Sequence, residues 1–322
     1  ALLVIVAHYF WVVQTAVNFE EASIDHAQKR TARIAAWRSG QRRFGGGAEK
    51  ARPGPFKLAG IGRPELAFLW KNLLSTWPYF NLRILGWSAL VITAVISWLG
   101  HQPAWRGVLP GVGIFAGIFG GYLLVIGPQF ARQDIRSDLA NADILKTYPI
   151  AGWQLVLGEI LTPVAILTGI IWLALLTFGL AFQTKAVGLA WLTPQLRLVC
   201  GGWIALITPA VVSLQLLVPN AAALVFPAWF QATRFRGGGP EVAGQRMIFF
   251  FAQLVTMAVA LLPVVLFGWL LIFILYHFTG PVVAITTAAI VVLIVLLGEV
   301  WCGLWLLGQR FEKFDLSAEL RS

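Results

Sequence analysis

The chain has 322 residues, of which 58% are hydrophobic and only 12% charged, and its mean hydropathy is +0.78. Soluble domains carry about 45–50% apolar and about 25% charged residues, so this composition excludes an ordinary soluble enzyme, a disordered chain and a disulfide scaffold. Apolar runs of about 20 residues indicate membrane-spanning helices, whereas a membrane barrel would show short alternating segments. The sequence therefore predicts an all-α integral membrane protein.

Seven apolar blocks follow one another along the chain, separated by polar joints. The first block begins at Ala1 without the basic start and small-residue cleavage site of a signal peptide, so we expect residues 1–19 to span the membrane. Because the chain opens directly on this block, we expect it to end an N-terminal part that is missing and to precede a basic linker over 20–63. The other six blocks, expected to form a bundle over 84–308, are 84–100, 108–128, 153–183, 198–219 with an apolar extension to 230, 247–276 and 281–308.

Lysine and arginine are distributed unevenly among the joints. The joints 20–83, 129–152 and 231–246 and the tail 309–322 hold 21 of the 24 basic residues, whereas the alternate joints hold three. Positive charge is retained on the cytoplasmic side of a membrane. We therefore expect the four basic segments, including the C-terminus, in the cytoplasm. The net charge of +10 accordingly indicates topology and no nucleic-acid partner.

The stretch 64–83, directly before the second apolar block, carries an apolar stripe at helical spacing. Lys71, Asn72 and Ser75 occupy the opposite face of that helix. A stripe of Leu and Trp opposite polar residues suits an elbow helix lying in the membrane interface. An amphipathic helix packed on protein is the alternative. The stripe consists of Leu66, Leu69, Trp70, Leu73, Leu74 and Trp77.

Small residues and prolines lie within the expected spans. Gly113, Gly117 and Gly121 form two overlapping GxxxG patterns, which let another helix approach closely in lipid. Proline removes a backbone donor, so each proline within a span marks an expected kink or break. These prolines are Pro163, Pro209 and Pro263.

Two acidic residues lie within apolar blocks. A charge at the membrane centre costs about 2.5–3.5 kcal/mol on insertion scales, so such residues usually face a partner or a cavity. Glu159 closely follows a basic joint and is expected near the headgroups, whereas Glu299 lies deeper. We interpret both as helix-packing or interfacial residues, with a proton relay as the alternative. The sequence contains no nucleotide-binding, metal-binding or hydrolytic motif, so we expect no catalytic residue, cofactor or metal site in this chain.

The joint 129–152 is neither a plain loop nor a span. Its apolar residues recur at helical spacing and predict a short helix over 131–148, which Pro149 ends. Such a helix is too short to be stable alone, so we expect it to dock on the membrane surface or on a cytoplasmic partner. Its mixed charge favours a groove on a protein over anionic lipid. The apolar residues are Ile135, Leu139, Ala142 and Leu145, and the charged ones are Arg132, Asp134, Arg136, Asp138, Asp143 and Lys146.

Several stretches of the chain resemble one known family. Asp134–Leu139, Asp143–Ile150 and Gly158–Pro163 are similar to the bacterial family of ABC-type export permeases. The resemblance extends over about 63–314, and family members are longer, with additional spans before the basic linker. The shorter matching stretches are Trp70–Leu74, Asn220–Ala223, Phe226–Trp229 and Glu241–Arg246.

The resemblance implies a permease of the bacterial inner membrane, with 64–83 as the elbow helix, 84–308 as a six-span bundle and 131–148 as a coupling helix. The coupling helix would sit in a groove of a separate ABC ATPase, which would bind the ATP and Mg²⁺, so this chain itself would be no enzyme. A second permease copy or a homologous half would complete the transporter. An ion-coupled secondary transporter, a membrane enzyme and an anchoring subunit are the alternatives. The residues expected to contact the ATPase are Asp134, Arg136, Asp138, Asp143, Lys146 and Tyr148.

Overall fold

The computed structural model describes most of the chain after the basic linker. Its regular elements there are all helices, and six of them are long and apolar enough to cross a membrane. The chain is therefore an all-helical, multi-pass membrane protein. The expected span over 1–19, most of the linker over 20–63 and residues 315–322 lie outside the described residues. Those described are 55–57, 62–76, 81–105, 107–131, 134–182, 192–227 and 240–314.

The six long helices match the six apolar blocks expected between residues 84 and 308, but several of them are longer than the blocks. A helix continues beyond the apolar run wherever its polar end can be solvated, so hydropathy locates the membrane-crossing part and not the helix ends. The largest difference lies at the start of α10, which begins before the apolar block. The six helices are α3 (Leu82–His101), α4 (Leu109–Phe130), α7 (Gly152–Ala181), α8 (Pro194–Val225), α10 (Pro240–Thr279) and α11 (Pro281–Lys313).

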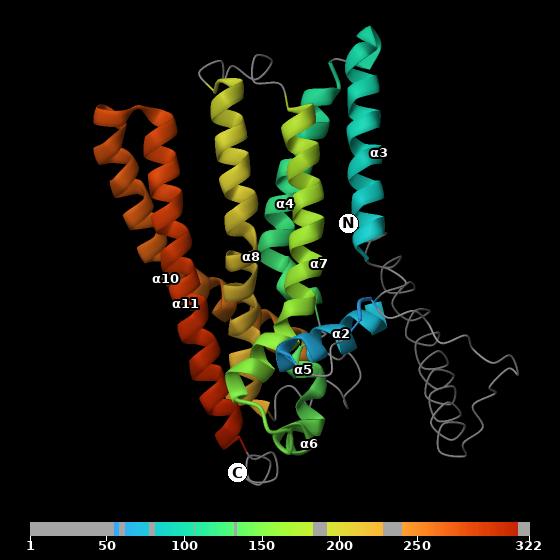
Figure 1. Ribbon diagram of the computed structural model, residues 1–322, viewed down its shortest axis with the longest axis vertical. Coiled ribbons are helices and arrows are strands. Elements are labelled where there is room, and N and C mark those ends of the chain that lie inside the picture. Colours follow the sequence, from blue (N-terminus) through green and yellow to red (C-terminus); the bar gives the residue numbers. More distant parts are fainter. Residues whose placement is uncertain are drawn as a thin grey trace, which may run out of the picture. The chain divides into compact units, whose positions relative to one another are not determined.

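Helix α7 is the hub of the bundle. It packs against α3, α4, α8 and α11, and also against the short helix α2 (Pro64–Thr76), whereas α10 packs mainly on α11. Figure 1 shows α2 lying across the axes of the long helices near one end of the bundle. The same end carries the connection between α4 and α7. Residues of this connection belong to the largest buried apolar cluster, together with residues of α7, α8 and α11.

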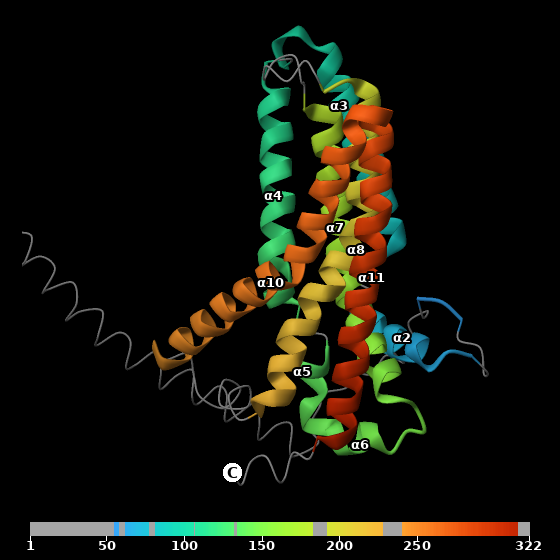
Figure 2. The same ribbon diagram turned by 90° about the vertical axis from the view of Figure 1, so that its left-hand side faces the viewer.

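The prolines within the spans do not end their helices. Pro163 lies inside α7, Pro209 inside α8 and Pro263 inside α10, and the helix continues on both sides of each. None of the three prolines therefore breaks its helix, and of the expected kink or break only a kink remains. Helix α10 is nevertheless bent, and Figure 2 shows its N-terminal part running outward from the other helices. At its other end α10 turns sharply into α11 through Gly280, whose φ of 79° lies in the region that favours glycine.

Helix α4 packs on the second half of α7 through glycines. A Cβ atom added to Gly113 would lie 2.6 Å from the backbone nitrogen of Phe182, and one added to Gly117 would lie 3.0 Å from the Phe178 ring. Among the described residues nothing lies within 4 Å of such an atom on Gly121, so Gly121 takes no part in this contact with α7. Gly120 takes that place, with Ala174 Cβ at 3.3 Å, because the contact stripe shifts from a four-residue to a three-residue step.

This contact gives a matched pair of variants. Gly113→Ala is expected to destabilise the protein by about 1–3 kcal/mol, because the new methyl group meets the backbone of Phe182 and the helices must move apart. Gly121→Ala on the same helix should leave the stability unchanged, since its methyl group enters open space. Thermal unfolding of both variants in the same detergent, followed by tryptophan fluorescence, measures the difference. Equal melting temperatures would show that α4 does not pack on α7 through Gly113.

Candidate docking segment and its polar anchors

The connection between α4 and α7 is folded into three short turns of helix. They are α5 (Ile135–Asp138), the 3₁₀ turn η2 (Leu139–Asn141) and α6 (Ala142–Lys146), so the expected continuous helix over 131–148 is wrong. The Asp134 side chain caps α5 by accepting from the backbone N–H of Arg136 at 3.1 Å. Asp138 and Asn141 each stand before the next turn with non-helical backbone angles. Short polar side chains of this kind favour caps and turns over helix interiors.

The apolar stripe of this segment is buried against the chain itself. Its four residues belong to the largest core cluster, together with Leu155 on α7, Leu224 on α8 and Phe311 on α11. The expectation that the stripe docks on lipid or on a partner is therefore wrong, since the groove that receives it lies between the chain's own helices. The four buried residues are Ile135, Leu139, Ala142 and Leu145.

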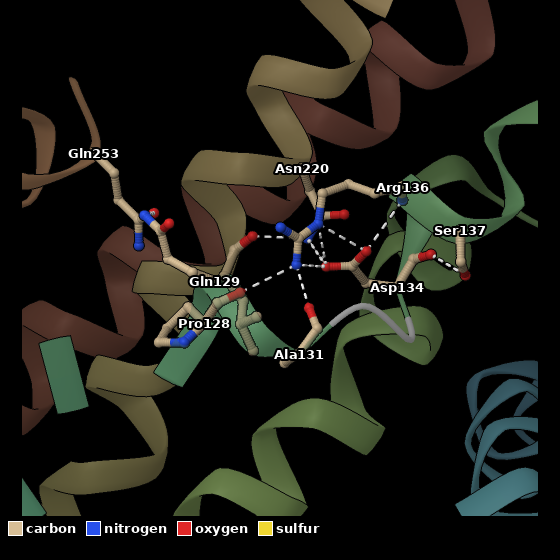
Figure 3. A network of polar contacts seen from close by, with 9 residues as sticks. Pro128, Gln129, Ala131, Asp134, Arg136, Ser137, Asn220 and Gln253 are labelled. Atoms are coloured by element: carbon tan, nitrogen blue, oxygen red, sulfur yellow. Dashed lines mark hydrogen bonds and ion pairs between the residues drawn. The ribbon is translucent and has the colours of Figure 1, made fainter. Parts of the chain in front are cut away.

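A buried ion pair forms the first polar anchor of the segment (Figure 3). Asp134 is 0% exposed, and its carboxylate accepts from Arg136 Nε at 3.0 and 2.9 Å. Asn220 on α8 donates through Nδ2 to the same carboxylate at 3.1 Å. Asp134 therefore ties the segment to α8 at a place where an unpaired charge would be costly.

The arginine of this pair also holds the end of α4. Arg136 Nη2 donates to the carbonyl oxygen of Pro128 at 3.1 Å and to that of Ala131. Both carbonyls lie in the last turn of α4 or directly after it, where no intrahelical donor remains. A cation is favoured at this end of a helix by the helix dipole as well. Arg136 thus caps α4 and fixes its direction relative to the segment.

A second anchor joins the segment to α2 and α7. Lys71 on α2 donates to Asp138 at 2.5 Å and to Glu159 on α7 at 2.9 Å, and Asn72 donates to the other Glu159 oxygen at 2.8 Å. Glu159 is fully buried, whereas Lys71 is about half exposed. Glu159 lies about 33 Å along α7 from Ala181, because an α-helix rises 1.5 Å per residue. Its expected position near the headgroups stays a prediction.

The elbow helix is interrupted before residue 83 and packs on the bundle through polar and apolar side chains. Helix α2 ends at Thr76, two residues before Pro78, and Asn81 caps the following helix α3 by accepting from Ile84 N at 2.9 Å. The expected single helix over 64–83 is therefore wrong. Asn72 is buried against α7, Phe68 packs on the largest apolar cluster, and Leu66 is exposed, so α2 packs on protein through polar and apolar side chains together.

The ion pairs decide the protonation of Lys71. Burial of the ammonium group alone lowers its pKa, but the hydrogen bonds to Asp138 and Glu159 outweigh this effect, and the pKa of Lys71 is raised. A raised folded-state pKa contributes stability that is present below the pKa of the unfolded chain and is lost as the pH rises through the folded value. Lysine in an unfolded chain titrates near 10.4, so the anchor is charged throughout the neutral range.

A third anchor connects the segment to the end of α11. Lys146 Nζ donates to the carbonyl oxygen of Phe314, directly after the last residue of α11. Close by, Glu312 Oε1 accepts from the backbone N–H of Gly152 at 2.7 Å and satisfies the first turn of α7. Both bonds bring together chain segments about 160 residues apart, so no local pattern in the sequence could indicate them.

Of the six residues expected to contact an ATPase, two point outward. Asp143 and Tyr148 are exposed, and Ile144 beside them is 60% exposed. We call Asp143, Ile144, Thr147 and Tyr148 the docking face. The other four expected residues are engaged within the chain by the three anchors. These are Asp134, Arg136, Asp138 and Lys146.

The second intramembrane acid stands apart from these anchors. Glu299 lies about 27 Å along α11 from Pro281, so it is placed nearer to the end that carries α5 and α6 than to the other end. Its Oε2 atom is buried and finds no hydrogen-bond partner in the part of the chain that the structure describes. Both oxygens of Glu159, by contrast, accept from α2.

Two glutamines that the sequence did not single out form one more contact at this end. Gln129 Nε2 on α4 donates to Gln253 Oε1 on α10 at 3.0 Å, as Figure 3 shows. Gln253 is a polar residue in an apolar stretch of α10, and it is only 5% exposed. The signal that could have found it is a lone amide side chain among apolar neighbours in a spanning helix, since such groups seek a polar partner.

No protein-family model, no curated protein and no solved structure matches this chain.

Proposed function

We propose that this chain is the membrane-spanning permease subunit of an ABC exporter. A separate ATPase subunit, carrying the ATP and Mg²⁺, docks on the docking face from the cytoplasm. The transporter works in the bacterial inner membrane, with its C-terminus in the cytoplasm and with a second permease copy or a homologous half beside it. The substrate is exported across that membrane.

The single observation that supports this proposal most is how the segment between α4 and α7 is held. Its inner side is fixed to α2 and α7 by Lys71, to α8 by Asp134 and to α11 by Lys146. Its outer side presents an aromatic residue, an aliphatic residue and an acid. A part that is rigidly joined to four helices and exposed on its other side is suited to pass a partner's movement into the bundle.

The stretches that resemble the permease family supply the anchors. Lys71 and Asn72 come from Trp70–Leu74, Glu159 comes from Gly158–Pro163, and Asp134, Arg136 and Asp138 come from Asp134–Leu139. Stretches far apart in the sequence thus meet in two adjoining networks. This supports the proposal, because a shared architecture needs such residues in contact.

An ion-coupled transporter is less well supported. Such a mechanism needs polar groups near the middle of the membrane. Glu159 has both oxygens bonded to α2, whereas Glu299 lies near the midpoint of α11, about 27 Å from Pro281 and about 21 Å from Lys313. A proton relay between the two acids is not favoured, because Glu159 is already engaged by Lys71 and Asn72.

Co-purification tests the proposed function directly. The tagged protein is extracted from native membranes in mild detergent, and mass spectrometry identifies what is retained. We expect a stoichiometric P-loop ATPase with the wild type and a loss of at least tenfold with Tyr148→Ala or with Asp143→Arg, because an exposed aromatic and a charge partner are removed from the docking face.

The matched control is Trp105→Ala, which removes an exposed aromatic residue from the turn Pro103–Trp105 between α3 and α4. It should retain the ATPase as the wild type does. Absence of an ATPase from wild-type preparations that keep other membrane complexes intact would contradict the proposed function. An ATPase retained equally by all variants would contradict the docking face.

A further inference from the structure

Helices α4 and α10 approach each other at the end that carries the docking segment. The two helices otherwise share little contact, since α4 packs mainly on α7 and α10 mainly on α11. Gln129 on α4 and Gln253 on α10 nevertheless meet through a side-chain hydrogen bond of 3.0 Å. Figure 3 shows the two amides pointing toward each other beside the Arg136 network. This hydrogen bond therefore joins α4 to α10, two helices with few other contacts between them.

An amide pair of this kind favours two states over a gradual range. The net gain from one hydrogen bond is small, but an amide that is buried without a partner is costly. Gln253 is more than nine-tenths buried. Two arrangements therefore satisfy both amides: a closed one in which they bond to each other, and an open one in which water reaches both. Intermediate separations leave the amides without partners. This is the behaviour expected of a latch.

The docking segment holds the α4 side of this contact. Arg136 donates to the carbonyl oxygens of Pro128 and Ala131, which lie on either side of Gln129 in the sequence. The guanidinium is itself fixed to Asp134, which is bonded to Asn220 on α8. A displacement of the segment therefore moves the last turn of α4, and Gln129 with it, relative to α10.

We propose that Gln129 and Gln253 form a latch that closes α4 against α10, and that the docking segment controls it through Arg136. Opening the latch separates the two helices at this end and admits water between them. The role of the latch in transport rests on the proposed function. A partner that moves the docking face would open or close the substrate path between α4 and α10 at this end. The latch itself is a property of this chain alone.

The distance between α4 and α10 tests the latch without any partner. Spin labels are attached at Phe130→Cys and Val255→Cys, both at exposed positions, in a background with Cys200→Ser and Cys302→Ser. Pulsed electron paramagnetic resonance on the protein in liposomes gives the distribution of distances. The unaltered latch should give one main, short distance.

Removing either amide should add a longer distance. Gln253→Leu and Gln129→Leu are each expected to raise the ratio of open to closed molecules about 2- to 10-fold, which corresponds to the loss of one hydrogen bond. Gln309→Leu, an exposed amide near the end of α11, is the matched control and should resemble the unaltered protein. Distributions unchanged in both latch variants would overturn the latch.

Control by the docking segment needs a separate variant that leaves both glutamines intact. Arg136→Lys keeps the charge beside Asp134 but cannot hold both carbonyls with a fixed planar fork, so it should also add the longer distance. Asn220→Ala, which loosens Asp134 from α8, should act in the same direction if the lysine variant does not fold. An open latch in Gln253→Leu together with a closed latch in these variants would overturn the control. Because no ATPase is present, a failure of the proposed function leaves this result interpretable.

Discussion

Replacing Lys71 by Met is expected to lower the free energy of unfolding by about 2–3 kcal/mol. The substitution keeps the length of the side chain but removes the charge that Asp138 and Glu159 share. Breaking one side of a fully buried ion pair costs about 3–5 kcal/mol. The expected loss is smaller because Lys71 is half exposed and water screens part of its interaction, and because Asn72 still donates to Glu159.

The double variant Lys71→Met with Glu159→Gln separates an ion pair from simple packing. It should recover part of the loss, because no uncompensated charge then remains buried beside α2. Lys57→Met, at an exposed lysine ahead of α2, serves as the control and should be neutral. Glu159→Gln alone completes the cycle, and equilibrium unfolding in mixed detergent micelles, followed by tryptophan fluorescence, measures all four variants. A double variant that is as unstable as the sum of its single variants would show that Lys71 and Glu159 do not interact.

The architecture could be predicted because each spanning helix is indicated by its own stretch of the sequence. An apolar run of about 20 residues is sufficient to place a span, whatever the rest of the chain does. The blocks 84–100 and 108–128 correspond to α3 and α4 within two residues at each end. The glycines of α4 could be recognised as packing residues for the same reason, although the choice between Gly120 and Gly121 depends on the crossing with α7.

The docking segment could be found from the sequence but its partner could not. The spacing of Ile135, Leu139, Ala142 and Leu145 shows an apolar side, and an apolar side must be covered. Whether lipid, another protein or the chain itself covers it depends on contacts with residues such as Phe311, more than 160 positions away. The charged residues of the segment are divided in the structure. Some bond to other helices of the chain as anchors, and Asp143 lies on the surface.

The anchors were missed because charge alone does not reveal a partner. Asp134 and Asp143 have the same chemistry and lie nine positions apart in one segment, yet Asp134 is 0% exposed and Asp143 is on the docking face. The difference arises from Asn220 and Arg136, which meet Asp134 only after α8 packs against the segment. Only the packed structure separates an acid that holds the fold from an acid that is available to a partner.

This difference in burial predicts a large loss of stability for one aspartate-to-alanine substitution and almost none for the other. Asp134→Ala should destabilise the protein by about 3–5 kcal/mol, because it leaves Arg136 buried without its partner and frees the end of α4. Asp143→Ala should change the stability by less than about 0.5 kcal/mol, as is usual for exposed positions. Equilibrium unfolding of both variants in the same micelles measures the contrast.

The same two variants have the reverse ranking in partner binding. When each is purified at a temperature where it is folded, Asp143→Ala should retain less of the proposed ATPase than the wild type, because it removes a charge from the docking face. Asp134→Ala lacks a group that lies inside the chain, so any molecules that remain folded should retain more than the Asp143 variant does. Equal stability of the two variants would contradict the buried anchor at Asp134. A folded Asp134 variant that loses the ATPase first would place that residue, and not Asp143, in the contact.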